Sequence, residues 1–283
     1  MEARSDLIYD VGLFDGVDTA YYLFRGYNVV AIDANPLMIE KARSRFPEEI
    51  RTKRLTLLNV GISNTPGTET FWISDHPDWS SFDRTMASRT GVATKSAVVQ
   101  TMPFSEILSE HGVPHYLKID IEGHDKLCVE GLSRDMLPTY ISVESECAID
   151  SRTLSDDDAL SMLKLLRHVG YRRFKLVKQA TCMSIRPNSA ANFCVSLVSS
   201  VARGRLQVRG LSTIAYKFTD AARIESNLGY AFSHDCSGPW GEDIPGDWMD
   251  FEKASSVYLR TRRAYFSRKQ AVYSFWYDWH ATY

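Results

Sequence analysis

The first 180 residues of the chain alternate short apolar runs with stretches of helical spacing, and this rhythm limits the folds open to it. The apolar runs predict strands at residues 7–11, 28–33, 54–60, 116–121, 140–144 and 171–178. The stretches between them predict helices at residues 18–25, 37–46, 103–111, 125–132 and 155–168. Strands that alternate with helices pair in parallel through right-handed crossovers. We therefore expect an α/β fold.

The remaining segments follow the rhythm less closely. A turn signal at residues 64–67 predicts a hairpin between the segments on either side of it. Further expectations are a loop at 74–94, a strand at 193–198, a loop at 236–247, a helix at 250–266 and an aromatic tail at 273–283. We expect an N-terminal domain at residues 1–200 and a C-terminal elaboration at residues 201–283 that packs on it.

Composition excludes several classes of protein. Hydrophobic residues make up 44% of the 283 and charged residues 24%, which is globular usage rather than that of a disordered or fibrous chain. With 33 basic and 35 acidic residues the net charge is -2, so charge gives no reason to expect nucleic acid or an anionic membrane as a partner. No apolar run approaches the roughly 18 residues of a membrane span. Five scattered cysteines without a CxxC pair argue against a structural zinc site or a disulfide framework. We expect a cytoplasmic protein with free thiols.

The turn after the first predicted strand carries a glycine pattern. Asp10, Gly12, Gly16 and Thr19 form D-x-G-x-x-x-G-x-x-T between a strand and a helix. Glycines let a backbone approach a ligand closely, and a helix N-terminus favours negative charge. The spacing is not the GxGxxG of dinucleotide-binding enzymes. An ordinary tight turn is the alternative explanation.

The second predicted strand ends in Asp33, which lies 23 residues after Asp10 and precedes Ala34-Asn35-Pro36. In doubly wound sheets an acid at this point reaches ribose hydroxyls. Together with the glycine turn, Asp33 predicts a ligand that contains adenosine. The alternative is that Asp33 only caps the following helix.

The segment from Leu117 to Asp125, L-K-I-D-I-E-G-H-D, places charges on a predicted central strand. Alternation puts Lys118, Asp120 and Glu122 on one side of that strand. Ligands in open α/β sheets bind beyond the carboxyl ends of the strands, where Asp120 and Glu122 are expected. A structural ion pair between Lys118 and Asp120 is the alternative.

These motifs resemble those of the FkbM-type S-adenosylmethionine-dependent methyltransferases. The hallmark segment is L-K-I-D-I-E-G-H-D-K-L-C-V-E-G-L (117–132), and the cofactor motifs are D-V-G-L-F-D-G-V-D-T (10–19) and V-V-A-I-D-A-N-P (29–36). Segments 140–144, 174–177 and 237–243 are also similar, so the resemblance spans roughly residues 7–250. Asp15 departs from it, since relatives more often carry a small or uncharged residue there.

The resemblance implies a class I methyltransferase fold, with a Rossmann-like sheet of seven mostly parallel strands, an antiparallel last strand and helices on both faces. It also implies methyl transfer from S-adenosylmethionine to a hydroxyl of a sugar, glycan or other natural product. Asp33 would bind the ribose and Asp120 would lie beside the reacting methyl group. The full set of implied cofactor residues is Asp10, Gly12, Phe14, Asp15, Gly16, Asp18, Thr19, Asp33, Ala34, Asn35, Asn59, Val60 and Asp120.

An alcohol is a weak nucleophile, so a general base is expected. The candidates are Asp120, Glu122, His124 and His234. A divalent metal ion held by Asp120, Glu122 or Glu144 is a less favoured arrangement, and we predict no resident metal.

Trp240, Glu242 and Asp243 are the candidate substrate residues, because aromatic faces and carboxylates suit the CH faces and hydroxyls of a sugar. A surface loop held by buried tryptophans is the alternative. The aromatic tail is expected to pack internally or to join two copies of the chain.

Two rival functions stay open. One is a non-catalytic nucleotide- or glycan-binding module on a methyltransferase fold, although the intact set of Asp10, Asp33 and Asp120 favours an enzyme. The other is an NAD-dependent dehydrogenase, which the missing GxGxxG disfavours.

Overall fold

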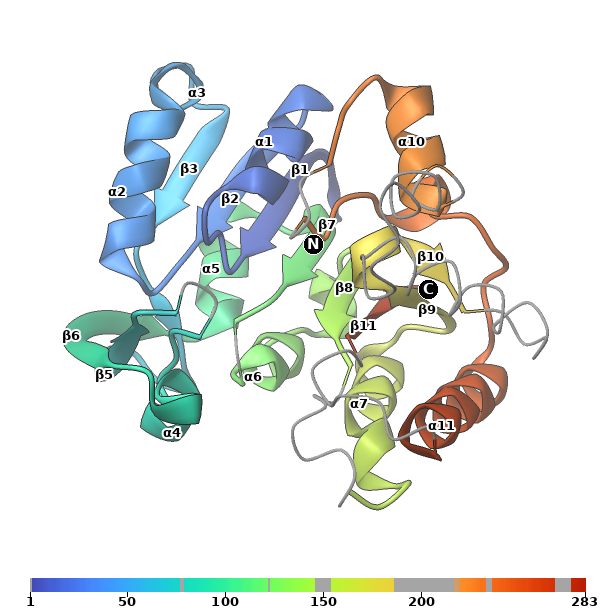
Figure 1. The fold of residues 1–283 in the computed structure, drawn as a ribbon. Coiled ribbons are helices and arrows are strands. Elements are labelled where there is room, and N and C mark those ends of the chain that lie inside the picture. The colour runs from blue at the N-terminus through green and yellow to red at the C-terminus, as the bar shows by residue number, and fades with distance from the viewer. Residues whose placement is uncertain are drawn as a thin grey trace. The chain divides into compact units, whose positions relative to one another are not determined.

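The computed structural model describes residues 2–76, 79–121, 123–145, 154–185, 217, 219–232, 236–267 and 276–283. The chain divides into two compact units, Met1–Thr139 and Tyr140–Tyr283. Each unit combines strands with helices, so the fold is mixed α/β as predicted (Figure 1). The last strand of the chain belongs to the second unit because it pairs with a strand that begins at residue 140. The predicted domains at residues 1–200 and 201–283 stay a prediction.

The first unit is built on a parallel sheet with the strand order β7-β1-β2-β3. Its strands are β1 (Arg4–Val11), β2 (Asn28–Ile32), β3 (Leu55–Leu58) and β7 (Pro114–Ile119). Its helices are α1 (Val17–Phe24), α2 (Pro36–Arg45), α3 (Pro47–Arg51), α4 (Arg84–Ala87), α5 (Phe104–His111) and α6 (Asp125–Glu130). The predicted alternation of strand and helix is confirmed here, and the carboxyl ends of β1, β2 and β7 lie at one edge of the sheet.

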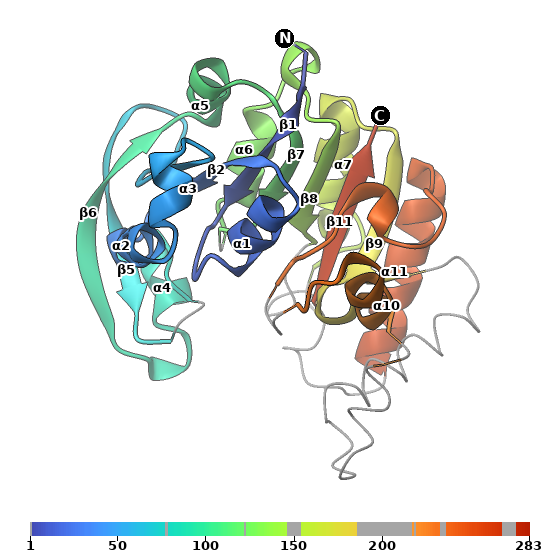
Figure 2. The ribbon, with the colours of Figure 1, turned by 90° about the horizontal axis from the view of Figure 1, so that it is seen from above.

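Two tyrosines show that helices cover both faces of this sheet. Tyr9 on β1 meets Phe104 of α5 edge-on, with ring centroids 6.2 Å apart. Tyr116 on β7 meets Tyr22 of α1 at 5.7 Å. Because Ile8 is the register partner of Tyr116, the neighbouring Tyr9 points to the opposite face. Helices α1 and α5 therefore lie on opposite sides of the sheet, as Figure 2 shows.

The first unit also holds a three-stranded sheet with the order β4-β6-β5. Its strands are β4 (Gly61–Ile62), β5 (Gly67–Ser74) and β6 (Thr94–Met102). The predicted hairpin across residues 64–67 is wrong, because β5 pairs along its whole length with β6, which lies between β5 and β4. The segment at 74–94, predicted as a loop, contains α4 and a 3₁₀ turn at Arg89–Gly91.

The second unit is built on a sheet with the order β10-β9-β11-β8. Its strands are β8 (Tyr140–Glu144), β9 (Arg173–Lys178), β10 (Met183–Ser184) and β11 (Tyr277–Thr282), and its helices are α7 (Ser161–Val169), α10 (Asp220–Leu228) and α11 (Phe251–Ser267). As expected, the last strand is antiparallel to both of its neighbours. The tail residues 277–282 are all buried. Internal packing is one of the two roles predicted for the tail.

A buried lysine fastens the loop before α11 to the sheet of the second unit. Lys175 on β9 donates hydrogen bonds to the carbonyls of Gly241 and Ile244, at 3.0 and 2.7 Å, and its ammonium lies 4.3 Å from the centre of the Trp248 ring. Burial lowers the pKa of Lys175, and the nearby Glu242 and Asp247 oppose that shift. Lys175 thus holds the loop through main-chain carbonyl groups of the loop.

Some predictions concern residues outside the described ranges, namely the strand at 193–198 and the tail residues 273–275. Within the described ranges, Cys128, Cys182 and Cys236 are buried and take part in no disulfide. No described helix has both the length and the apolar character that crossing a membrane requires.

The Tyr9 hydroxyl gives a test of the first unit's packing. It donates a hydrogen bond of 2.7 Å to the carbonyl of Gly112, and the side chain is fully buried. Tyr9→Phe should lower the free energy of unfolding by about 1 kcal/mol, because the carbonyl loses its partner. Urea denaturation measures this, with Tyr283→Phe at an exposed position as the control. Equal midpoints for wild type and Tyr9→Phe would contradict the packing described here.

Candidate functional site

The turn between β1 and α1 has an unusual backbone. Gly12, Phe14 and Gly16 all have positive φ, at 88°, 50° and 79°. A side chain on Gly12 would place its Cβ 1.8 Å from the carbonyl oxygen of Asp120, so only glycine allows the turn to approach the end of β7. Phe14 adopts the left-handed conformation without being glycine, which is a strain typical of ligand-binding turns.

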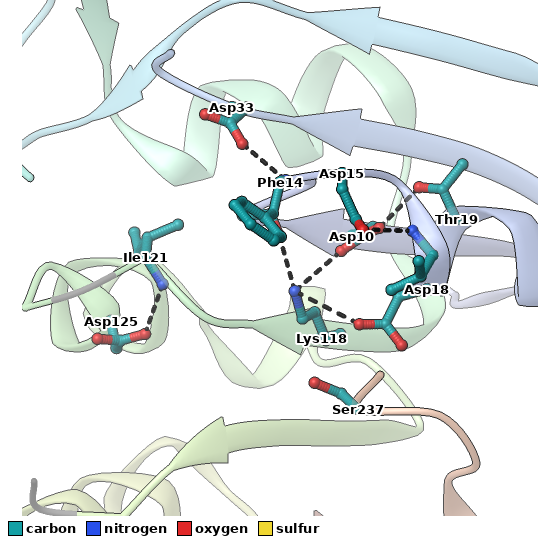
Figure 3. A network of polar contacts seen from close by, with 12 residues as sticks. Asp10, Phe14, Asp15, Asp18, Thr19, Asp33, Lys118, Ile121, Asp125 and Ser237 are labelled. Carbon is teal, nitrogen blue, oxygen red and sulfur yellow. Dashed lines mark hydrogen bonds and ion pairs between the residues drawn. The ribbon is translucent and has the colours of Figure 1, made fainter. Parts of the chain in front are cut away.

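A buried ion network lies beneath this turn (Figure 3). The Lys118 ammonium on β7 lies 3.2 Å from a carboxylate oxygen of Asp10 and 3.9 Å from one of Asp18. It also donates a hydrogen bond of 2.8 Å to the carbonyl of Gly12. The Thr19 hydroxyl donates to the other oxygen of Asp10 at 2.6 Å. The network joins β1, β7, the turn and the first turn of α1.

Lys118 remains protonated in this network. Burial alone would lower its pKa, but the carboxylates of Asp10, Asp120 and Asp18 together raise the pKa above the ordinary value. The ion pairs found are with Asp10 and Asp18, and the predicted alternative of a Lys118–Asp120 pair is not found among the described contacts. Asp120 acts on Lys118 through its charge alone.

Asp33 lies just past the end of β2 and is partly exposed. Its two carboxylate oxygens accept the backbone N–H groups of Phe14, at 2.8 Å, and Asn35, at 2.7 Å. Burial raises the pKa of Asp33 to about 6, although these two hydrogen bonds oppose the shift. An ionised carboxylate accepts about four hydrogen bonds, so roughly two positions stay open to a ligand.

The predicted adenosine residues surround Asp33. The Asn59 side chain donates to the carbonyls of Asp33 and Ala34, at 2.9 and 3.1 Å. Asn35 is buried and caps α2 by accepting the N–H of Leu37. Val60 is buried directly after Asn59. Asn59 therefore fixes the main chain directly after the end of β2.

Asp15 is exposed at the tip of the turn. One of its carboxylate oxygens accepts the N–H of Val17 at 3.1 Å, and its carbonyl accepts a hydrogen bond from the Arg45 guanidinium at 2.7 Å. The side chain thus accepts the first N–H group of α1, at a helix end where a negative charge is favourable.

The carboxyl end of β7 holds two further acids. Asp120 is partly exposed, and its carboxylate makes no hydrogen bond or ion pair within the described part of the chain. Asp125 accepts the N–H groups of Ile121 and Gly123, at 3.1 and 3.2 Å, and so shapes the loop between β7 and α6. Burial and the nearby Asp120 raise the pKa of Asp125. Of the two, Asp120 is the one open to a substrate.

His124 lies in the same loop and is held on two sides. Its ring stacks on Phe82, with centroids 4.9 Å apart, and its Nδ1 lies 3.3 Å from the carbonyl of Ile62. A carbonyl only accepts, so Nδ1 carries the hydrogen in the neutral ring and Nε2 carries the lone pair. Nε2 is therefore the nitrogen that could accept a proton.

The other predicted site residues lie either outside the described ranges or in the second unit. Glu122 and His234 lie outside the described residues. The predicted substrate residues belong to the second unit, where Trp240 is buried, Asp243 is half-buried, and exposed Glu242 accepts a hydrogen bond of 2.8 Å from the Trp248 indole. The described part of the chain contains no group of three or more His, Cys, Asp or Glu side chains arranged to hold a metal ion.

The family can be decided from a sequence comparison. Residues 10–173, more than half of the chain, match the methyltransferase FkbM domain. The chain belongs to the FkbM methyltransferase family. The matched region of this FkbM protein contains the glycine turn, Asp33, the Lys118 network and the 120–125 loop.

Other comparisons add little to this assignment. No curated protein matches the FkbM chain. A solved structure, the methyltransferase domain of bacterial CtHen1-CN, aligns with 66% of this chain and 84% of its own at 9% identity and a TM-score of 0.37. A likeness that weak carries no argument about fold or activity.

Three residues that support this candidate site carry no local signal in the sequence. Phe82 and the carbonyl of Ile62 hold His124, and Arg45 holds the turn at Asp15. They lie 30 or more residues from the groups they hold, and nothing in their local sequence marks that contact. Only the tertiary structure brings them to the site.

Loss of Lys118 tests the buried network. Lys118→Met should lower the free energy of unfolding by about 3–5 kcal/mol, because the carboxylates of Asp10 and Asp18 stay buried without compensation. Chemical denaturation measures the loss, and Lys41→Met at an exposed helix position is the matched control. Adding Asp10→Asn to Lys118→Met should restore part of the stability. A Lys118→Met variant as stable as its control would refute the network's structural role.

Proposed function

We propose that the chain is an S-adenosylmethionine-dependent O-methyltransferase that acts on a hydroxyl of a sugar, glycan or other natural product. One observation carries the proposal: the N–H of Phe14 donates to the carboxylate of Asp33. This hydrogen bond joins the glycine turn to the end of β2, so the two predicted cofactor motifs form one site. The parallel β7-β1-β2-β3 sheet and the antiparallel last strand support a class I methyltransferase fold.

The residues present fit this cofactor. Asp33 has open acceptor positions for the two ribose hydroxyls, and the two N–H groups that it accepts fix its orientation. Ala34, Asn35, Asn59 and Val60 would line the adenosine side. Gly12, which admits no Cβ, keeps the turn against the end of β7 at Asp120. The bound cofactor supplies an electrophilic methyl group on a sulfonium centre.

The chain's own task is then to position the acceptor and to remove its proton. A general base is worth roughly 10²–10⁴-fold in rate for a neutral hydroxyl. Asp120 offers an accessible carboxylate at the end of β7, and His124 offers Nε2 four residues later. In-line positioning of the acceptor oxygen can contribute about 7 kcal/mol or more. Asp120 and His124 are therefore the proposed catalytic residues.

The second unit supports a sugar-like acceptor. Glu242 is exposed and is oriented by the Trp248 indole N–H, and the Trp248 ring is held by Lys175 and by stacking at 6.2 Å on Tyr140. A fixed carboxylate beside a fixed aromatic ring matches the hydroxyls and CH faces of a sugar. Trp240 is buried, so its part in the proposal is to support the loop.

Calorimetric titration with S-adenosylhomocysteine and, separately, with NAD tests the cofactor. The proposal expects binding of S-adenosylhomocysteine and none of NAD. Transfer of an isotope-labelled methyl group to a panel of glycans and hydroxylated natural products then tests the reaction. Cofactor binding without transfer to any member of a broad panel would favour the non-catalytic binding module, and binding of NAD alone would favour the dehydrogenase.

Asp33 makes cofactor binding depend on pH. Ribose hydroxyls donate to the ionised carboxylate, whose pKa is about 6. The affinity for S-adenosylhomocysteine should therefore be constant above pH 7 and fall as the pH drops through 6. Asp33→Asn should weaken binding by roughly 10-fold or more at pH 8, and its affinity should not fall between pH 7 and 5.5. Calorimetric titration with S-adenosylhomocysteine between pH 5.5 and 8 measures both effects. The control is Glu40→Gln, at an exposed position of α2. A normal affinity in Asp33→Asn would remove Asp33 from the site.

A substitution of Asp120 tests its proposed part in methyl transfer. Asp120→Asn keeps the size of the side chain but cannot accept a proton. Methyl transfer to an acceptor found in the panel should fall by at least about 10²-fold. The thermal melting temperature should stay close to that of wild type, because Asp120 makes no ion pair with Lys118. Early melting together with near-normal turnover would show that Asp120 is structural.

A further inference from the structure

Asp10, the acid of the glycine pattern and one of the implied cofactor residues, is closed to ligands. Asp10 is fully buried, with one oxygen beside the Lys118 ammonium and the other accepting the Thr19 hydroxyl. Asp18 is 5% exposed and also faces Lys118. A ligand ammonium could reach either acid only by displacing Lys118, which would leave a buried charge without its partner. The ammonium of the cofactor therefore requires an acceptor other than Asp10 and Asp18.

Asp15 meets that need. It is exposed on the same turn, between Gly12 and Gly16. Its Oδ1 accepts the Val17 N–H and its carbonyl is held by Arg45, so both its side chain and its main chain are fixed before a ligand arrives. Its carboxylate forms no ion pair with any described lysine, arginine or histidine, and Oδ2 has no hydrogen-bond donor among the described residues. A fixed acceptor binds a cation with little further loss of conformational entropy.

Asp120 is the rival carboxylate, and its proposed part in catalysis favours Asp15 over it. The carboxylate of Asp120, together with those of Asp10 and Asp18, raises the pKa of the Lys118 ammonium. Asp120 is also the proposed general base, and an ammonium bound to its carboxylate would block that role. Arg45 is the cation nearest to Asp15 among its described contacts, and it binds the carbonyl of Asp15 rather than the carboxylate.

We propose that Asp15 binds the α-ammonium group of the cofactor's amino-acid part. This inference rests on the proposed function, since it concerns the same cofactor. Asp15 is then a binding residue that sets recognition of the amino-acid part, while Asp33 sets recognition of the ribose. Asp10 and Asp18 support the turn from below through Lys118.

Two ligands separate these roles without any methyl acceptor. The first is S-adenosylhomocysteine, and the second is its analogue with hydrogen in place of the α-amino group. Calorimetry should show that wild type prefers S-adenosylhomocysteine. Asp15→Asn should lower the affinity for S-adenosylhomocysteine by at least about 10-fold and leave that for the analogue unchanged. Asp33→Asn is the matched control, because it should weaken both ligands by the same factor.

Asparagine at position 15 can still accept the Val17 N–H, so the turn should persist, and thermal melting checks this. Asp15→Ser, which keeps a helix-capping oxygen without the charge, is the second variant and should give the same selective loss. If Asp15→Asn and Asp15→Ser both retain the wild-type preference between the ligands, the inference is overturned while the proposed function stands. If Asp120→Asn instead abolishes the preference, Asp120 is the ammonium ligand. If wild type binds neither ligand, the proposed function fails and the inference fails with it.

Discussion

The buried ammonium of Lys118 is the constraint on which the site depends. It lies on β7, next to Asp10 in the register of the parallel sheet, and it is 3% exposed. A charge in that position requires compensation, and Asp10, Asp18 and the carbonyl of Gly12 supply it. Each comes from a different part of the strand–turn–helix segment. The contacts that compensate the charge of Lys118 therefore fix the path of the turn and the position of the first turn of α1.

That constraint divides the acids of the first unit into two groups. Asp10 and Asp18 are buried around Lys118 and support the turn. Asp15, Asp33 and Asp120 stand at the surface of the same region, each with acceptor capacity that the described contacts leave open. The first group makes the turn rigid, and the second is free to meet a ligand. In our proposal these three acids receive an ammonium, a ribose and a hydroxyl proton.

The sequence predicted the parts of this site that are local. Apolar runs and glycines located the strands and the turn, and position after a strand singled out Asp33. The partner of Lys118 was missed, because alternation along one strand identifies Asp120 as a neighbour but cannot show that Asp10 lies beside Lys118 on the next strand. The pairing of β5 with β6 was missed for the same reason, since it depends on segments distant in the chain.

A crystal structure of the protein with bound S-adenosylhomocysteine would test the central claim most directly. Our account predicts density for the ribose against the Asp33 carboxylate, the adenine beside Asn59 and Val60, and the amino-acid part along the turn that contains Asp15. The Lys118 contacts to Asp10 and Asp18 should be unchanged in that complex. Ligand density at another place on the chain, with the β1–α1 turn empty at saturating concentration, would contradict the account.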